Sequence, residues 1–235
     1  MKLGVNIDHI ATLRNARGGF EPSVLDAAVI CERQGVSAIT VHLREDRRHI
    51  RDNDVLELKK FLHTNINLEM AQTIEMQEFA LKTLPYACCI VPEKRQELTT
   101  EGGLVVAGKV LEIAQFIKPL QEKGIVISLF IEPSEEQVKA AAQTGAEFVE
   151  LHTGKYAEAF GGDLENSEFE RLQNAAKLAQ SLGLQVNAGH GLNYENVSNM
   201  KKIDGIVELN IGHSIVSRAV FVGLERAVKE MLGLI

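Results

Sequence analysis

Histidines and carboxylates gather at the ends of short apolar segments in this sequence. Five of the seven histidines lie there. They are His9, His42, His152, His190 and His213. Glu69 and Glu150 occupy the same kind of position. Histidine gives and takes protons near neutral pH, and a carboxyl group becomes an effective base when its surroundings raise its pKa. The pattern predicts a site for repeated general acid–base catalysis.

Polar residues at these segment ends recur at a spacing of two, with an apolar residue between them. The pairs are Asn6 with Asp8, His42 with Arg44, Asn67 with Glu69, Glu150 with His152, and Glu208 with Asn210. In a β-strand, residues two apart share a face, so each pair points one way and its apolar neighbour the other. Burying so many ionisable groups without a task would be costly. Asn67, Glu208 and Asn210 could still serve only to brace the sheet, and His152 could serve only to orient Glu150.

The segments that carry these residues have the composition of short buried strands. They are Leu3–Asp8, Ala38–Leu43, Ile66–Met70, Tyr86–Val91, Ile125–Ile131, Phe148–His152, Gln185–Ala188 and Ile206–Ile211. Segments with helical apolar spacing lie between them, such as Val24, Ala27, Ala28 and Cys31. Eight strand–helix alternations without a linker predict one α/β domain over residues 1–235, a (β/α)8 TIM barrel. Active sites of such barrels lie at the carboxyl ends of the strands, so these polar groups should meet there.

An open, doubly wound sheet is the competing architecture, but it usually has a glycine-rich loop after its first strand. The segment Asn6–Thr12 contains no glycine. Further predicted helices are Met76–Leu84, Val106–Gln121, Glu135–Thr144, Phe169–Leu182, Asn196–Lys202 and Ser214–Leu232. The last of these is apolar around more of its surface than one core contact requires, which predicts a homo-oligomer. The longest irregular insertions are Glu93–Gly103 and Thr153–Ser167.

Two groups of residues are suited to phosphate. Gly189–Gly191 and Gly212–His213 follow the last two strands, where barrels often bind phosphate through backbone N–H groups. Arginines after the first two strands predict a second anion site. They are Arg14, Arg17, Arg44, Arg47 and Arg48. The alternative, which we favour for the last two, is that they form surface ion pairs. The acidic partners would be Glu45, Asp46 and Asp52.

Composition argues against several classes of function. The net charge of −7 disfavours a broad surface for nucleic acid or anionic membrane. No apolar run approaches the ~18 residues of a membrane span, and polar residues come too early for a signal peptide. Cys31, Cys88 and Cys89 are interpreted as buried hydrophobes of a cytoplasmic protein. No zinc-like spacing is present. Lys94 and Lys155 are the candidates for Schiff-base chemistry.

Several long motifs resemble the pyridoxine 5′-phosphate synthase family of vitamin B6 biosynthesis. They are Gly4–Arg14, Ile39–Ile50, Asn67–Met70, Val91–Glu97, Thr99–Leu104, Glu150–Gly154, Val186–Leu192 and Glu208–His213. They follow in order along essentially the whole chain. The resemblance implies condensation of two phosphorylated small molecules, 3-amino-2-oxopropyl phosphate and 1-deoxy-D-xylulose 5-phosphate. The products would be pyridoxine 5′-phosphate, phosphate and water, with no metal or organic cofactor. It also implies a homo-oligomer, commonly an octamer built from dimers.

The resemblance also implies roles for individual residues. His42 and Glu69 match the family's proton acceptors. His190 matches its proton donor, and Glu150 the residue that stabilises charge in the transition state. The positions that hold the amine substrate match Asn6, Arg17, Gly191, Gly212 and His213. Those that hold the deoxyxylulose phosphate match Asp8, His9, Arg44, His49 and Thr99.

The Glu93–Gly103 segment ends in two glycines and is a candidate lid that would shield reactive intermediates from water. Two other functions stay open. The first is a sugar-phosphate lyase or aldolase that acts through Lys94 or Lys155, which borohydride trapping would reveal. The second is a non-catalytic ligand-binding barrel, which would bind deoxyxylulose phosphate without turnover.

Overall fold

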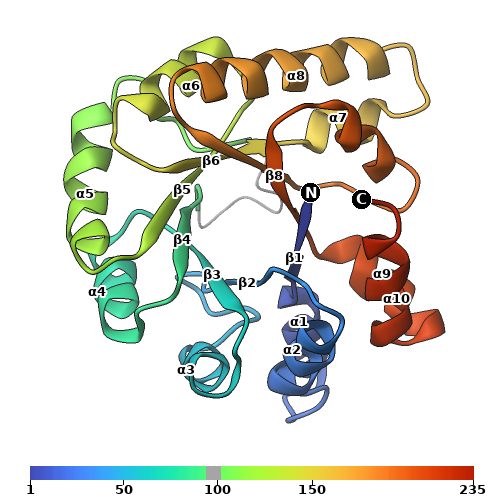
Figure 1. Cartoon of the computed structure of the whole chain (residues 1–235). Coiled ribbons are helices and arrows are strands. Elements are labelled where there is room, and N and C mark those ends of the chain that lie inside the picture. The colour runs from blue at the N-terminus through green and yellow to red at the C-terminus, as the bar shows by residue number, and fades with distance from the viewer. Residues whose placement is uncertain (94–101) are drawn as a thin grey trace.

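Eight parallel strands form a closed barrel and pair in the order of the sequence (Figure 1). The structure is a computed structural model that describes residues 1–93 and 102–235. The strands are β1 Lys2–Asn6, β2 Ala38–His42, β3 Asn65–Met70, β4 Ala87–Ile90, β5 Val126–Ile131, β6 Phe148–His152, β7 Gln185–Gly189 and β8 Ile206–Ile211. β1 pairs with both β2 and β8, which closes the ring. The predicted (β/α)8 fold is therefore confirmed.

Helices follow the strands and form an outer ring around the barrel (Figure 1). They are α1 Asp8–Arg17, α2 Val24–Arg33, α3 Asp52–Phe61, α4 Ile74–Thr83, α5 Val110–Glu122, α6 Glu135–Ala142, α7 Gly154–Ala159, α8 Glu165–Ser181, the 3-10 helix η1 Val197–Lys202, α9 His213–Val222 and α10 Leu224–Leu232. Hydroxyl side chains cap several of them. Ser23, Thr73 and Ser134 each accept a hydrogen bond from a backbone N–H of the first turn.

The main core lies between the sheet and the helices. Leu68, Leu151 and Leu209 are fully buried there, as their spacing between polar residues predicts. On α2, the predicted stripe of Val24, Ala27, Ala28 and Cys31 is buried against the same core. All three cysteines are buried and free. The apolar side of each strand thus faces the helices, which leaves the polar side for the barrel interior and its mouth.

The first strand is shorter than predicted. Its pairing with β2 ends when Ile7 N–H donates to Thr40 O at 3.1 Å, and Asp8 begins α1 instead of ending β1. The reason is local, because Asn6 Oδ1 accepts the Asp8 N–H at 2.9 Å and turns the chain into a helix. Asp8 and Asn6 still lie together, since Asn6 Nδ2 donates to Asp8 Oδ2 at 2.9 Å.

The last predicted helix is two helices. Gly223 separates α9 from α10 with a φ of +82°, a conformation that side chains disfavour. The wide apolar surface is thereby explained in part, because each helix buries its own face, including Ile215 on α9 and Met231 on α10. Val220 and Phe221 remain exposed at the end of α9.

Two other segments differ from the prediction. The insertion Thr153–Ser167 is not irregular, since it contains α7 and the first turn of α8. Asn196–Lys202 forms a 3-10 helix, not an α-helix. Within the described part of the chain, no helix is long and apolar enough to cross a membrane.

Candidate active site

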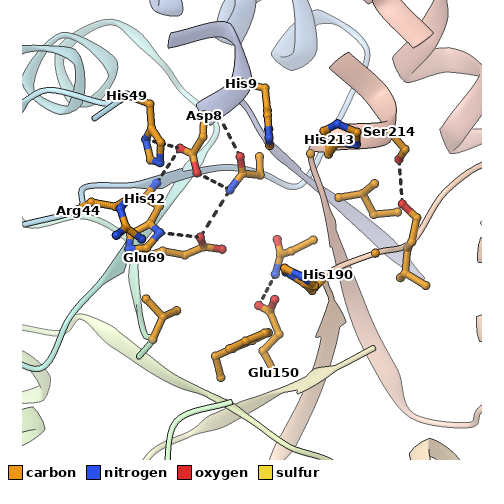
Figure 2. A pocket seen from close by; sticks show the side chains of 18 of the residues that line it. Asp8, His9, His42, Arg44, His49, Glu69, Glu150, His190, His213 and Ser214 are labelled. Carbon is orange, nitrogen blue, oxygen red and sulfur yellow. Dashed lines mark hydrogen bonds and ion pairs between the residues drawn. The ribbon is translucent and has the colours of Figure 1, made fainter. Parts of the chain in front are cut away.

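A cavity of about 620 Å³ opens where the strands end. Its lining includes twelve of the fourteen residues predicted for the site (Figure 2). They are Asn6, Asp8, His9, His42, Arg44, His49, Glu69, Glu150, His190, Gly191, Gly212 and His213. The other two are Arg17, which is exposed at the end of α1 and outside the lining, and Thr99, which lies outside the described residues. Most of the candidate lid predicted at Glu93–Gly103 also lies outside the described residues.

Asp8 organises one side of the cavity. Its Oδ1 accepts the backbone N–H of His42 at 2.8 Å, and its Oδ2 accepts from Asn6. His49 Nδ1 lies 3.9 Å from the same Oδ1. Burial lowers the pKa of His49 more than Asp8 raises it, so this imidazole favours its neutral form. Asp8 thus ties the start of α1 to the end of β2.

His42 lies between two glutamates. Its Nε2 is 2.7 Å from Glu93 Oε1, and its Nδ1 is 4.0 Å from Glu69 Oε2. Glu93 also accepts the backbone N–H of Glu45 at 3.0 Å. Burial opposes ionisation of Glu93, but His42, the Glu45 N–H and Arg44 together outweigh burial and lower the Glu93 pKa. An ionised Glu93 only accepts hydrogen bonds, so Nε2 of His42 carries a proton.

Glu93 was not among the predicted site residues. The sequence signal was available, since Glu93 closely follows the fourth strand, as Glu69 ends the third. Glu69 itself is only partly exposed, and desolvation raises its pKa well above the usual range, with the nearby carboxylates of Asp8 and Glu150 adding to the shift. A raised pKa makes the carboxylate a stronger base.

Glu150 is held by Asn210 on the opposite side of the barrel mouth (Figure 2). Asn210 Nδ2 donates to Glu150 Oε2 at 2.7 Å, and Asn210 Oδ1 accepts from Thr40 Oγ1 at 3.0 Å. Burial, with Glu208 adding, raises the pKa of Glu150 to about 7. The alternative that His152 orients Glu150 is therefore wrong, because the hydrogen bond comes from Asn210. A Cβ at Gly189 would lie 2.5 Å from Glu150 Oε1, so this position needs glycine.

His190 follows β7 in a backbone conformation that is uncommon outside glycine, with a φ of +79°. Its ring lines the cavity, and burial, with the nearby His152 adding to the shift, lowers its pKa to about 4. The two rings lie 4.8 Å apart, centre to centre. His152 does not line the cavity, and its Nδ1 is 2.7 Å from Glu132 Oε1. Glu132 was not singled out from the sequence, although it directly follows the fifth strand.

The predicted phosphate region lies at the ends of β7 and β8. Gly212 and His213 begin α9, whose first backbone N–H groups are suited to an anion. A Cβ at Gly212 would lie 2.9 Å from Asn6 O, and Gly191 has a φ of +82°, so neither position suits a larger residue. His213 packs edge to face against His9 at 5.0 Å. Burial and His213 lower the pKa of His9.

Most of the arginines are engaged with carboxylates. Arg14 is buried and makes two hydrogen bonds to Asp54, at 2.6 and 2.9 Å, so it braces α1 against α3 and is not part of an anion site. Arg47 pairs with Asp52 and Glu75, in agreement with the predicted surface ion pair. Arg48 pairs with Asp46 at 2.7 Å, and Arg44 contacts the same carboxylate at 3.2 Å. Only Arg44 and Arg48 of these arginines line the cavity within the described chain.

Neither candidate lysine for Schiff-base chemistry is among the described residues that line the cavity. Lys155 is largely exposed, its Nζ lies 3.4 Å from Glu132 Oε2, and it is not part of the lining. Lys94 lies outside the described residues.

Asp8, His42 and His49 form a group that could bind a metal, with one ligand atom from each within 4.8 Å of the others. All three already have hydrogen-bond partners, and those of Asp8 are the His42 N–H and Asn6. His42 Nε2 contacts Glu93, and His49 Nδ1 accepts the Ile50 N–H at 2.9 Å. That the reaction uses no metal stays a prediction.

Comparisons with known proteins agree with the resemblance. Residues 3–235 match the family described as "Pyridoxal phosphate biosynthesis protein PdxJ". The chain is 56% identical over 234 residues to the pyridoxine 5′-phosphate synthase of Geobacter sulfurreducens, covering 100% of this chain and 98% of that protein. It is 56% identical over 231 residues to the enzyme of the same name from Synechococcus sp. (strain JA-2-3B'a(2-13)), covering 98% and 97%.

Solved structures show a likeness of fold alone. A 3-hexulose-6-phosphate synthase matches with a TM-score of 0.69 at 17% identity, and both chains are covered completely. A tryptophan synthase alpha-subunit from Pyrococcus furiosus matches with a TM-score of 0.66 at 15% identity, covering 98% of this chain and 96% of that one. The family match and the relatives at 56% identity decide the assignment, and the chain belongs to the PdxJ family of pyridoxal phosphate biosynthesis proteins.

Proposed function

We propose that this protein is a pyridoxine 5′-phosphate synthase. It condenses 3-amino-2-oxopropyl phosphate with 1-deoxy-D-xylulose 5-phosphate and releases phosphate and water. The observation that carries the proposal is one cavity lined by two carboxyl groups with raised pKa values, Glu69 and Glu150, and by the imidazoles of His42 and His190. Joining an amine to a ketone, expelling water and closing an aromatic ring takes several proton transfers, which need such groups.

Glu69 and His42 take protons from the substrates. The raised pKa of Glu69 gives its carboxylate the basicity that this step requires. Glu93 keeps a proton on Nε2 of His42, so the lone pair of the neutral ring lies on Nδ1, the nitrogen nearer Glu69. Glu150 stabilises positive charge that develops on nitrogen once its own proton has left, because a buried carboxylate interacts strongly with a nearby cation.

His190 donates a proton. With its pKa lowered to about 4, its imidazole is neutral in the empty cavity at neutral pH. A phosphorylated substrate brings negative charge next to the ring, which raises the pKa of His190 and lets it accept the proton that it later donates. His190 is therefore neutral in the empty enzyme and becomes protonated once the substrate is bound.

The substrates are held at opposite sides of the cavity. Gly191, Gly212 and His213, with Asn6, bind the amine substrate through backbone N–H groups at the start of α9 and nearby side chains. The deoxyxylulose phosphate lies against a second group. Its described members are Asp8, His9, Arg44 and His49, with Thr99 assigned by resemblance. Arg17 has no support from this chain's own cavity, because it is exposed outside the lining.

We also propose that the protein acts in the cytoplasm as a homo-oligomer, an octamer built from dimers. Exposed Val220 and Phe221 at the end of α9, and Phe20 after α1, are apolar surface that assembly could cover. The three buried, free cysteines suit a reducing compartment. Light scattering across a dilution series tests the assembly, and a monomer at every concentration would contradict it.

The function is tested by incubating metal-stripped protein with both substrates and analysing the products by mass spectrometry. We expect pyridoxine 5′-phosphate from the wild type and a sharp loss of product in His42→Ala. If the folded wild type gives no product, the proposal fails. Borohydride trapping of a substrate on lysine would then favour a lyase or aldolase, and binding of deoxyxylulose phosphate without turnover would favour a ligand-binding barrel.

A further inference from the structure

A second histidine–carboxylate pair lies just outside the cavity, on the side of His190. Glu132 follows β5, and its Oε1 lies 2.7 Å from Nδ1 of His152, the last residue of β6. Neither residue lines the cavity. Any part that the pair plays in the reaction must therefore pass through a residue that does line it.

Glu132 is held as a carboxylate by the groups around it. The hydrogen bond with His152 lowers the pKa of Glu132 to about 2, against the effect of burial. Lys155 Nζ at 3.4 Å and Arg171 Nη1 at 3.3 Å, both next to Oε2, favour the charge further. A carboxylate only accepts hydrogen bonds, so the proton in this contact belongs to Nδ1 of His152.

The other nitrogen of His152 is left without a partner. Nε2 is buried and makes no hydrogen bond to any described residue. A buried polar atom without a partner costs free energy and calls for an explanation. The neighbouring geometry supplies one, because a Cβ at Gly154 would lie 2.8 Å from His152 Nε2 and 3.4 Å from His190 Cδ2. Glycine at position 154 therefore leaves Nε2 and the His190 ring facing the same small space.

The residue after His152 holds the backbone of His190. Thr153 Oγ1 lies 2.8 Å from Gly189 O and 2.5 Å from His190 O, and both carbonyl oxygens accept from it. His190 keeps its left-handed backbone conformation there, of the kind that persists only where the surroundings enforce it. The end of β6 thus contacts both the main chain and the ring of His190.

We propose that Glu132 and His152 are positioning residues for His190. When the His152 ring holds one proton, Glu132 fixes that proton on Nδ1 and leaves a lone pair on Nε2, and this ring sets the orientation of the His190 imidazole and the direction in which its proton leaves. In a catalytic triad, a carboxylate holds a histidine in one tautomer and orientation. Here Glu132 does this for His152, and the His152 ring in turn lies against the His190 ring. The inference rests on the proposed function only for the role of His190 as donor.

The tautomer is tested first, and this test needs no turnover. The wild-type protein is labelled with ¹⁵N-histidine and ¹³C-glutamate and studied by solid-state NMR, with His152 assigned through its contact with the Glu132 carboxyl carbon. We expect a protonated Nδ1 and, at a pH where the ring is neutral, an unprotonated Nε2. A neutral His152 with its proton on Nε2 would overturn the inference, whether or not the enzyme proves to make pyridoxine 5′-phosphate.

Kinetics then tests whether the pair acts through His190. Glu132→Gln keeps the shape but can hydrogen-bond to either tautomer. We expect kcat to fall about 10- to 100-fold, the range found for carboxylates that orient metal-bound histidines, with KM little changed. Glu132→Asp should restore part of kcat. Glu168→Gln is the matched control, since Glu168 contacts the same Arg171 at 2.7 Å without touching His152. A folded Glu132→Gln with the kcat and pH profile of the wild type would refute the proposal.

Discussion

The cavity has two sides, which we name after Glu69 and His190. On the Glu69 side, the ends of β1 to β3 bring Asp8 and Glu69 together with His42 and His49, and on the His190 side, the ends of β6 and β7 carry Glu150 and His190. Burial disfavours charge on both sides. It raises the pKa of Glu69, which makes this carboxylate a stronger base, and lowers that of His190, which favours the neutral imidazole.

Each side also contains one glutamate paired with one histidine, but the two pairs differ in position. Glu93 contacts Nε2 of His42, which itself lines the cavity. Glu132 contacts Nδ1 of His152, which lies behind His190. The comparison teaches that similar pairs can act at different distances from the substrates, directly at His42 and through a second ring at His190.

The largest effect on kcat should come from removing the proposed base, Glu69. Glu69→Gln removes the proton acceptor, and we expect kcat to fall by roughly 10²- to 10⁴-fold, the range for general acid–base groups. Glu208→Gln is the matched control, since burial also raises the pKa of Glu208 but this residue does not line the cavity. Equal losses in the two variants, measured by steady-state kinetics, would mean that Glu69 matters only as a structural residue of the barrel.

Glu93→Gln should have a smaller effect, because His42 would remain and only its orientation would loosen. We expect a fall in kcat of about 10- to 100-fold, similar to that for carboxylates that orient metal-bound histidines. The same assay run on Glu132→Gln makes the comparison direct. If Glu93→Gln keeps the wild-type kcat, the two pairs are not equivalent and His42 does not need its carboxylate partner.

Stability should depend on pH in opposite directions through Glu150 and through His190. Glu150 has a folded-state pKa raised from 4.5 to about 7, so its contribution is complete below pH 4.5 and is lost as pH rises through 7, by up to about 3 kcal/mol. Glu150→Gln should therefore flatten the loss of stability between pH 5 and pH 8. Urea unfolding at both pH values measures this, and an unchanged pH dependence would contradict the raised pKa.

For His190, the pH dependence of stability has the opposite sign. His190 has a folded-state pKa lowered from 6.5 to about 4, so its stabilising contribution is present above pH 6.5 and is lost as pH falls toward 4. His190→Asn should flatten that acid-side loss, and asparagine tolerates the positive φ of this position. Urea unfolding at pH 7 and pH 5 is the measurement, and the wild-type slope in this variant would argue against a buried, neutral His190.

The smallest effect should come from Lys155. This lysine is exposed and outside the cavity lining, so Lys155→Met should change kcat by less than about twofold, within the range of surface substitutions. A large loss, together with borohydride trapping on the wild type but not on this variant, would instead favour Schiff-base chemistry over acid–base catalysis by the Glu69 and His190 sides.

The sequence by itself determined the barrel and most of its mouth. Apolar residues that alternate with polar ones, as in Asn67–Met70, report which side of a strand is buried, and strand ends of a parallel barrel must converge. The sequence predicted the ends of strands and helices less well than their order. Asn6 Oδ1 accepts the Asp8 N–H where the chain turns into α1, and Gly223 divides the last predicted helix. Both features depend on backbone geometry that periodicity does not record.

Only the tertiary structure decided which polar groups meet. Glu93 and Glu132 follow strands like many other residues, and nothing in their local sequence tells that each contacts a histidine from another strand. The same holds for Arg14, whose partner Asp54 lies forty residues away and removes it from any anion site. The physical reason is that side-chain pairing and pKa values depend on distance and burial, which are properties of the packed barrel and not of sequence spacing.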